Sequence, residues 1–221
     1  MHHFKDRKDA GEHLAHNLSS YANQKETIIL AIPRGGVVIA NEVAKALKLP
    51  LDIIIPRKIG APLNPELAIG AVCEEETFFN QDLIEDLGVD TLFLDQELKK
   101  AKIEAKRRKS LYRANFPSLN LKNKIIILID DGIATGATIF TAIKYLKQQS
   151  IKRLVVATAV SSLDIAKELE QSVDEFISLL TPHNLTAIGL YYEHFEQVTD
   201  EEVISIMKMY ASAKLPDTLL S

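Results

Sequence analysis

The chain has 221 residues, of which 47% are hydrophobic and 25% charged, an ordinary globular composition with enough length to bury a substantial core in one domain. Its formal net charge of −4 argues against a protein that mainly coats nucleic acid, so we expect no nucleic-acid partner. A lone cysteine, Cys73, excludes an internal disulfide, and the first residues lack the apolar run of a secretory signal. Because no apolar stretch approaches the ~20 residues of a membrane helix, the sequence predicts a cytoplasmic protein without a membrane segment.

Apolar runs of strand length alternate with amphipathic stretches, a pattern typical of a parallel β-sheet covered by helices on both faces. An amphipathic helix is predicted first, over residues 6–20, with Ala10, Leu14 and Leu18 on its apolar face. Strands are then predicted at 27–32, 51–55, 67–72, 124–129, 153–159 and 175–180, and helices at 37–47, 137–149 and 162–169. Sheets of this kind hold ligands beyond the carboxyl ends of their strands, where we expect the functional residues.

A long helix is predicted over residues 90–113, because apolar residues such as Leu94 and Leu98 recur at helical spacing. It interrupts the alternation of strands and helices, so we expect an insertion of about residues 82–114 within a single domain spanning 1–221. Its run KKAKIEAKRRK could bind phosphate or RNA. The interleaved glutamates favour an ordinary solvated helix face instead.

The main candidate for a ligand-binding segment is IIILIDDGIATGAT, residues 125–138. In it an apolar strand is followed directly by two acidic residues, Asp130 and Asp131. Small residues and hydroxyls follow, with Gly136 permitting close backbone approach and the next helix offering its unpaired N–H groups, which together form a cradle for phosphate. The carboxylates would repel phosphate, so we expect them to meet ribose hydroxyls or a hydrated Mg²⁺ ion that bridges to pyrophosphate. The segment therefore predicts a site for a phosphorylated ribose that carries pyrophosphate.

The motif DDGIATGAT resembles the phosphoribosyl pyrophosphate (PRPP) signature of type I phosphoribosyltransferases, in which apolar residues precede two acidic residues, three others and Thr-Gly-x-Thr. Neither the phosphate loop of nucleotide hydrolases nor the G-x-G-x-x-G of dinucleotide-binding folds is present. The resemblance implies the type I phosphoribosyltransferase fold, an α/β fold with a parallel β-sheet core flanked by helices. It also implies that the ribose and its 5′-phosphate are bound by Asp130, Asp131, Ala134, Thr135, Gly136, Ala137 and Thr138. Asp130 and Asp131 would in addition be catalytic and would hold Mg²⁺ indirectly, through water and the ligand.

A second motif, PRGG at residues 33–36, follows the first predicted β-strand and opens a helix. Arg34 and the amides of Gly35 and Gly36 would stand at a helix N-terminus, which suits pyrophosphate. In the family that the chain resembles, this loop holds pyrophosphate and often contains a non-proline cis peptide, here expected around residues 34–36. An ordinary turn with Arg34 in solvent is the alternative interpretation.

Arg57 and Lys58 begin a Pro-rich stretch without clear periodicity, which predicts a loop before the strand at 67–72. The stretch resembles the family's flexible active-site loop. The resemblance implies that both cations are catalytic, stabilising the departing pyrophosphate, and that the loop closes to exclude water. Two simply solvated cations are the alternative.

The acceptor is less well defined by the sequence. In the hypoxanthine-guanine branch of the family, the residue before Thr-Gly is an aspartate that serves the purine, and here that residue is Ala134. A general base would therefore come from elsewhere, and the candidates are Glu74, Glu75 and Glu76, unless these three form a solvated turn.

The C-terminal segment, about residues 181–213, is expected to form a small hood, in which Tyr191 and Tyr192 would stack on a base or pack in the core. The whole pattern resembles a group of phosphoribosyltransferases without an assigned acceptor. It implies a homodimeric enzyme that displaces pyrophosphate from Mg-PRPP by a nitrogenous base, purine-like or pyrimidine-like, or runs the reverse reaction. Two alternatives remain: a regulator that binds PRPP or a nucleotide without turnover, and transfer to water or an atypical acceptor.

Overall fold

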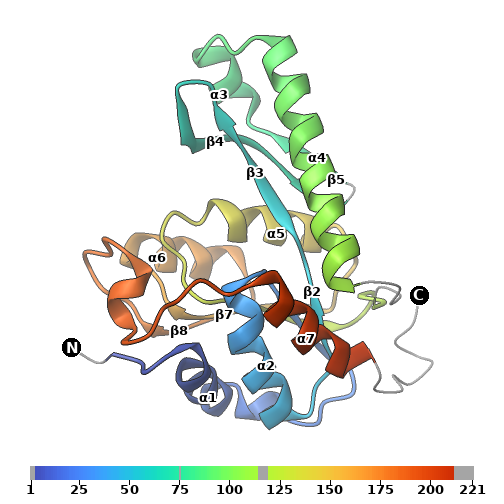
Figure 1. The fold of residues 1–221 in the computed structure, drawn as a ribbon, viewed down its shortest axis with the longest axis vertical. Coiled ribbons are helices and arrows are strands. Elements are labelled where there is room, and N and C mark those ends of the chain that lie inside the picture. The colour runs from blue at the N-terminus through green and yellow to red at the C-terminus, as the bar shows by residue number, and fades with distance from the viewer. Residues whose placement is uncertain (1–2, 75, 114–118, 212–221) are drawn as a thin grey trace.

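The computed structural model describes residues 3–74, 76–113 and 119–211. Five parallel strands form the central sheet of the body, in the order β2 (Leu51–Ile53), β1 (Thr27–Ala31), β6 (Ile125–Asp130), β7 (Arg153–Val160) and β8 (Glu175–Leu180). Helices cover both faces (Figure 1): α1 (Arg7–Asn17), α2 (Gly35–Leu47) and α7 (Asp200–Ala211) on one, α5 (Ala137–Lys147) and α6 (Leu163–Ser172) on the other. The predicted parallel sheet flanked by helices is confirmed.

Alternate residues of each strand point to opposite faces of the sheet. On β6, Ile127 and Ile129 pack with α1 and α2, whereas Ile126 and Leu128 pack with α5, and all four side chains are fully buried. Because both faces of the strand are covered, every position along it must be apolar, which explains the unbroken apolar runs of the sequence.

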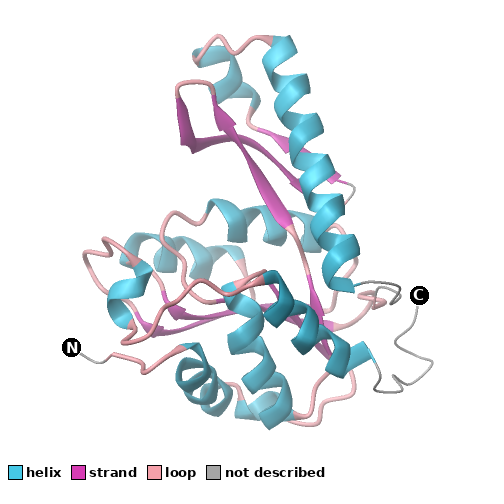
Figure 2. Cartoon of the chain, in the orientation of Figure 1, coloured by secondary structure: helices cyan, strands magenta, loops and turns pink. Residues whose placement is uncertain are grey.

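Residues 56–113 form a separate lobe above the body (Figures 1 and 2). Its antiparallel sheet consists of β3 (Pro56–Ala61), β4 (Asn64–Cys73) and β5 (Glu76–Phe79), followed by α3 (Gln81–Asp86) and α4 (Thr91–Arg113). A small apolar core of its own, which includes Ile59, Ile69 and Ile84, holds the lobe together. The two helices of the lobe fall in the insertion expected at about residues 82–114, and the three strands before them also lie outside the parallel sheet.

Two predictions for this region were wrong. Residues 67–72 lie in β4 and pair antiparallel with β3 and β5, so they are not part of the parallel sheet. Arg57 and Lys58 lie in β3 rather than in a loop. The reason is local: only Pro62 and Leu63 separate β3 from β4, and so short a connection joins neighbouring antiparallel strands, whereas a parallel crossover needs a dozen or more residues.

Helix α4 links the lobe to the body. Ala101 packs in the core of the lobe, while Ala105 and Tyr112 pack in the core of the body. At its end Arg113 forms a buried, bidentate ion pair with Asp52 of β2, with Nε–Oδ1 and Nη2–Oδ2 distances of 2.9 and 2.8 Å. These contacts fix the last turns of α4 against the body.

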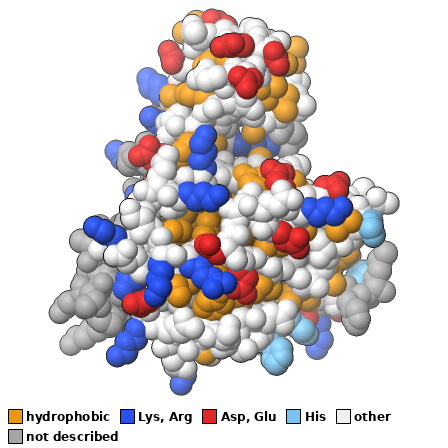
Figure 3. All heavy atoms as spheres, turned by 180° about the vertical axis from the view of Figure 1, so that it is seen from behind, with side chains coloured by type: hydrophobic (Ala, Val, Ile, Leu, Met, Phe, Trp, Pro, Cys, Tyr) orange, Lys and Arg blue, Asp and Glu red, His pale blue; other side chains and the backbone are white. Residues whose placement is uncertain are grey.

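The other predicted helices and strands agree with the structure to within a few residues, including α4, which was predicted over residues 90–113. Helix α7 was not predicted: it lies in the segment 181–213 that was expected to form a hood, yet Val203 and Met207 pack in the core of the body. Short 3₁₀ helices, η1 (Ser19–Tyr21) and η2 (Ile188–Tyr191), complete the described elements. Seen from behind, acidic and basic side chains are interspersed over the body and the lobe (Figure 3). Among the described helices, none combines the length and apolar character needed to cross a membrane.

Candidate active site

The PRGG motif and the DDGIATGAT motif lie at the same edge of the parallel sheet, after strands β1 and β6. Strands β1 and β6 pair in parallel, with Ala31 opposite Ile129, and Ile32 N donates a hydrogen bond to Ile129 O at 2.9 Å. Strand β2 follows β1 on one side of it, while β6 lies on the other, so the order of connection reverses between β1 and β6. Open α/β sheets bind ligands at such a switch point, beyond the carboxyl ends of the strands.

The PRGG loop packs directly on the two acidic residues. Helix α2 begins at Gly35 with Arg34 as its N-cap residue. A non-proline cis peptide joins Pro33 to Arg34, at the bond just before the expected residues 34–36. A Cβ atom added to Gly35 would lie 1.8 Å from Asp131 Oδ2, and one added to Gly36 would lie 2.8 Å from Ile129 O. The two glycines are therefore required because the loop and the end of β6 lie in contact.

Asp131 is held by an arginine far away in the sequence. Arg7 Nε of α1 donates to Asp131 Oδ2 at 2.7 Å, and the exposed fractions of the two side chains are only 11% and 17%. The Arg7 guanidinium also lies 3.7 Å from the centre of the Phe195 ring. Tyr192 Oη donates to Asp131 O at 2.7 Å, so both the side chain and the backbone of Asp131 are fixed.

Asp130 faces a different electrostatic environment. Its Oδ1 accepts a hydrogen bond from Asp131 N at 2.9 Å. Burial, and next the negative charge of Asp131, raise the pKa of Asp130 well above its ordinary value. A carboxylate pair with an excess of buried negative charge is stabilised by hydroxyl donors or by a cation.

Replacing Gly35 by alanine is expected to lower the free energy of unfolding by about 1–3 kcal/mol, because the added methyl group overpacks the contact with Asp131. Urea titration of the purified variant measures this change. In the Gly35→Ala, Asp131→Ala double variant the clash is absent, so the second substitution should restore part of the stability. A Gly35→Ala protein as stable as the unmodified chain would show that the loop is not in contact with Asp131.

The segment after Asp131, which the sequence predicts to be a phosphate cradle, lines a small pocket. The pocket has a volume of about 190 Å³ and is lined by Asp130 and by residues 132–139. Gly136 adopts a left-handed backbone (φ 75°) at the N-cap of α5, and Ala134 and Thr135 are exposed. Ser162 Oγ donates to Ala134 O at 3.0 Å and so holds the loop that precedes α5, whose first N–H groups are free of intrahelical partners.

The other predicted residues are placed as follows. Arg57 and Lys58 lie half-buried at the start of β3, where the lobe joins the body. Glu74 forms an ion pair with Lys109 of α4, and Glu76 is exposed on β5, while Glu75 lies outside the described residues. Neither of the two described glutamates is thereby distinguished as a general base.

The two tyrosines differ in their surroundings. Tyr192 is only 5% exposed, and its ring stacks on Phe195 at a centroid distance of 4.7 Å. It is therefore not free to stack on a base in this structure, and it supports Asp131 instead. Tyr191, which ends η2, is half-buried. Ile188 of the same segment packs on Gly132, so the C-terminal segment covers the acidic motif from one side.

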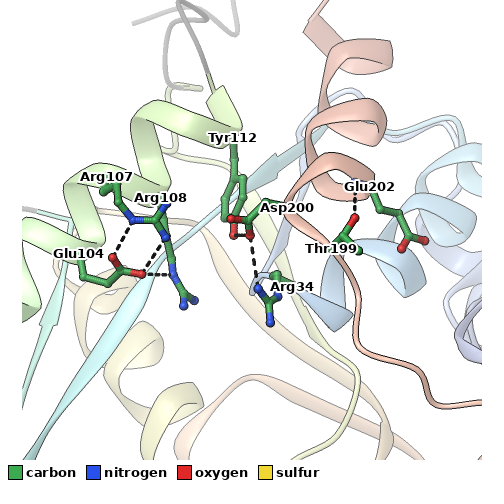
Figure 4. A network of polar contacts seen from close by, with 8 residues as sticks. All are labelled: Arg34, Glu104, Arg107, Arg108, Tyr112, Thr199, Asp200 and Glu202. Atoms are coloured by element: carbon green, nitrogen blue, oxygen red, sulfur yellow. Dashed lines mark hydrogen bonds and ion pairs between the residues drawn. The ribbon is translucent and has the colours of Figure 1, made fainter.

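The contacts that link Arg34 to Asp200 and Tyr112 were not predicted, because they join residues that are distant in sequence. Arg34 Nη1 lies 3.4 Å from Asp200 Oδ1 of α7, and Tyr112 Oη donates to the same oxygen at 2.6 Å (Figure 4). Arg108 of the KKAKIEAKRRK run is half-buried, with 22% of its side chain exposed, although most of the charged residues of that run are exposed. Lys106 of the same run is exposed, as predicted.

Comparison with known proteins is consistent with this geometry. The family model described as the phosphoribosyl transferase domain matches residues 2–193. The chain belongs to the phosphoribosyl transferase family. Rv0571c and MT0597, provisionally named phosphoribosyl transferases of Mycobacterium tuberculosis, are each 37% identical to it over 205 residues, or 92% of this chain and 46% of theirs. The phosphoribosyl transferase domain described here thus spans about half the length of these curated relatives.

A solved structure of the same shape is known. The crystal structure of TT1426 from Thermus thermophilus superposes with a TM-score of 0.83 at 36% sequence identity, covering 95% of this chain and 100% of that one. The likeness extends over the lobe as well as the body, because almost the whole of both chains is matched. The type I phosphoribosyltransferase fold expected from the sequence is therefore present.

Proposed function

We propose that this phosphoribosyl transferase domain binds Mg-PRPP and transfers its phosphoribosyl group to a nitrogenous base, or catalyses the reverse reaction. One observation carries the proposal: the PRGG loop and the DDGIATGAT loop lie in contact, with Gly35 packed on Asp131. A pyrophosphate loop, two carboxylates and a phosphate cradle are thereby brought within reach of one small ligand.

Each part of the ligand has a chemically suitable partner. The hydroxyls of ribose can donate to Asp130 and Asp131, and the 5′-phosphate can accept from the amides of residues 134–138 at the start of α5. Pyrophosphate can accept from Arg34 and from the first amides of α2. During transfer, the acceptor nitrogen forms a bond to the anomeric carbon as the bond to pyrophosphate breaks, and the cations stabilise the charge that grows on the departing group.

The residues also fit Mg²⁺ as the proposed cofactor. No group of three or more metal-ligating side chains occurs among the described residues, so a metal would not be held by protein ligands alone. The adjacent carboxylates of Asp130 and Asp131 match the usual magnesium environment, in which one or two carboxylates act together with water and substrate phosphates. When bound, Mg²⁺ would neutralise charge on the pyrophosphate.

We place the acceptor beside residues 181–195, because Ile188 of this segment packs on Gly132 next to the two carboxylates. Ala134 cannot exchange a proton with a purine, and Tyr192 is buried against Phe195. Leu190 is 60% exposed at the edge of this segment and offers an apolar surface instead. We propose that recognition of the acceptor rests on apolar contact and backbone groups here, not on an ionisable side chain of the loop 132–138.

Calorimetric titration of the purified protein with PRPP tests the proposal. We expect binding that is strengthened by Mg²⁺, and turnover when the bound complex is supplied with the correct base from a panel of purines and pyrimidines. Binding without turnover for any base would favour the alternative of a PRPP-sensing regulator. Absence of binding with and without Mg²⁺ would show that the fold has been adapted to another ligand.

A further inference from the structure

Four arginines from three parts of the chain lie at the junction of lobe and body: Arg34 before α2, Arg57 on β3, and Arg107 and Arg108 on α4. Figure 4 shows the guanidinium groups of Arg34 and Arg108 directed into the same space beside α4. Arg57, half-buried on β3, lies close enough to α4 to sense its charges: burial lowers the pKa of Arg57 most, the charge of Arg108 lowers it further, Glu104 raises it, and Arg107 has a smaller lowering effect.

Arg57 is incompletely satisfied in this arrangement. Its Nε is buried and has no hydrogen-bond partner, and the side chain forms no ion pair with a residue that the structure describes. A buried donor without an acceptor costs free energy, and so does a desolvated cation among like charges. An anion bound at this position would relieve both costs.

The local carboxylates neutralise only part of the positive charge. Glu104 accepts from Arg107 Nε at 2.8 Å and from Arg108 Nε at 2.7 Å, so one carboxylate serves two guanidinium groups. Asp200 Oδ1 accepts from the guanidinium of Arg34 and from the hydroxyl of Tyr112, so it neutralises one cation. Four cations against two anions leave a local positive charge in a chain whose formal net charge is −4.

We propose that Arg107 and Arg108 complete, with Arg34 and Arg57, a subsite for the diphosphate group of PRPP. The inference rests on the proposed function, because it extends the anion site of the PRGG loop toward α4. A diphosphate fits better than a single phosphate, since its two linked phosphoryl groups can accept from the body and from the lobe together. Guanidinium groups are well suited to bind diphosphate, because two N–H groups of one arginine can donate parallel hydrogen bonds to two phosphate oxygens.

This assignment gives the inserted lobe a role in the reaction. The diphosphate gains negative charge as it departs, and α4 supplies two cations beyond those of the PRGG loop. Asp200 and Glu104 hold the arginines when no ligand is present. Binding of diphosphate would draw Arg34 away from the 3.4 Å contact with Asp200, which is the longest of the ion pairs in this cluster.

Calorimetry with three probes tests the proposal: PRPP with Mg²⁺, inorganic diphosphate with Mg²⁺, and ribose 5-phosphate. The Arg108→Gln variant should bind the first two about 10-fold more weakly, because a charge-assisted hydrogen bond is lost. Its affinity for ribose 5-phosphate, which lacks the diphosphate, should be unchanged. Lys106→Gln is the matched control, with the same loss of charge from an exposed position on the same helix.

Arg57→Met separates a binding role from a structural one. Removal of an unsatisfied buried cation should leave the melting temperature of the ligand-free protein equal or higher, while affinity for both diphosphate ligands falls. If Arg108→Gln and Arg57→Met bind PRPP and diphosphate as tightly as the unmodified protein, the inference is wrong although the proposed function stands. If the unmodified protein binds none of the three probes, the proposed function fails as well.

Discussion

Replacing both Asp130 and Asp131 by asparagine is expected to weaken binding of Mg-PRPP by about 100-fold to 10,000-fold. Each carboxylate would accept a charge-assisted hydrogen bond from ribose, worth about 1.5–3 kcal/mol, and about 1.4 kcal/mol corresponds to a factor of ten in affinity. The amides keep the shape of the side chains but lose their charge. Calorimetric titration of the double variant against the unmodified protein measures the loss.

A matched control keeps this experiment specific. Asp86 on α3 and Asp95 on α4 are exposed residues of the lobe, and the Asp86→Asn, Asp95→Asn variant changes the net charge by the same amount. Its affinity for Mg-PRPP should match that of the unmodified protein. Retention of tight binding by the Asp130→Asn, Asp131→Asn variant would show that the ribose is bound elsewhere. Thermal unfolding of the double variant should be measured as well, because Asp131 also forms an ion pair with Arg7 and its loss could destabilise the fold.

The sequence predicted the body well because periodicity and motif chemistry are local properties. Unbroken apolar runs such as Ile126 to Ile129 follow from burial on both faces, and the acidic motif must follow such a strand to reach the sheet edge. Adjacency of the PRGG loop to Asp131 could be expected from the rule for switch points. The order of the strands, however, was not encoded in any single segment.

The lobe was predicted poorly for a physical reason. Its strands are not distinguished by alternation, because Gly60, Gly70 and the prolines interrupt the pattern, and residues 57–66 therefore resembled a loop. Contacts such as that of Arg7 with Asp131 join residues separated by 124 positions, and nothing in either local sequence indicates the partner. Electrostatic partners across a fold become visible only when the topology is known.

Replacing Arg113 by methionine is expected to lower the free energy of unfolding by about 3–5 kcal/mol, because the buried carboxylate of Asp52 then lacks its counter-ion. Both side chains are buried, at 8% and 6% exposure of the residues, and Arg113 also donates to Ile53 O at 3.0 Å. Urea titration measures the loss. As a control, Lys152→Met removes one partner of the exposed Lys152–Glu26 pair and should be nearly neutral.

The stability lost in the Arg113→Met variant should be largest near neutral pH and smaller at acidic pH. Burial raises the pKa of Asp52 above its ordinary value even beside Arg113, whose charge opposes the shift, so removal of Arg113 must raise it further. A carboxyl group whose pKa is higher in the folded than in the unfolded state stabilises the fold when protonated. The stability difference between the variant and the unmodified protein should therefore shrink as pH falls from neutrality toward the ordinary carboxyl range.

Adding Asp52→Asn to the Arg113→Met variant tests whether the anchoring of α4 matters for ligand binding as well as for stability. Asp52→Asn in the Arg113→Met background removes the uncompensated charge but keeps an acceptor for Ile53 N, so most of the lost stability should return. The end of α4 would still lack its bidentate anchor to β2, which lies a few residues beyond Arg107 and Arg108. If those arginines bind diphosphate, the double variant should be stable yet bind PRPP more weakly than the unmodified protein, with unchanged affinity for ribose 5-phosphate.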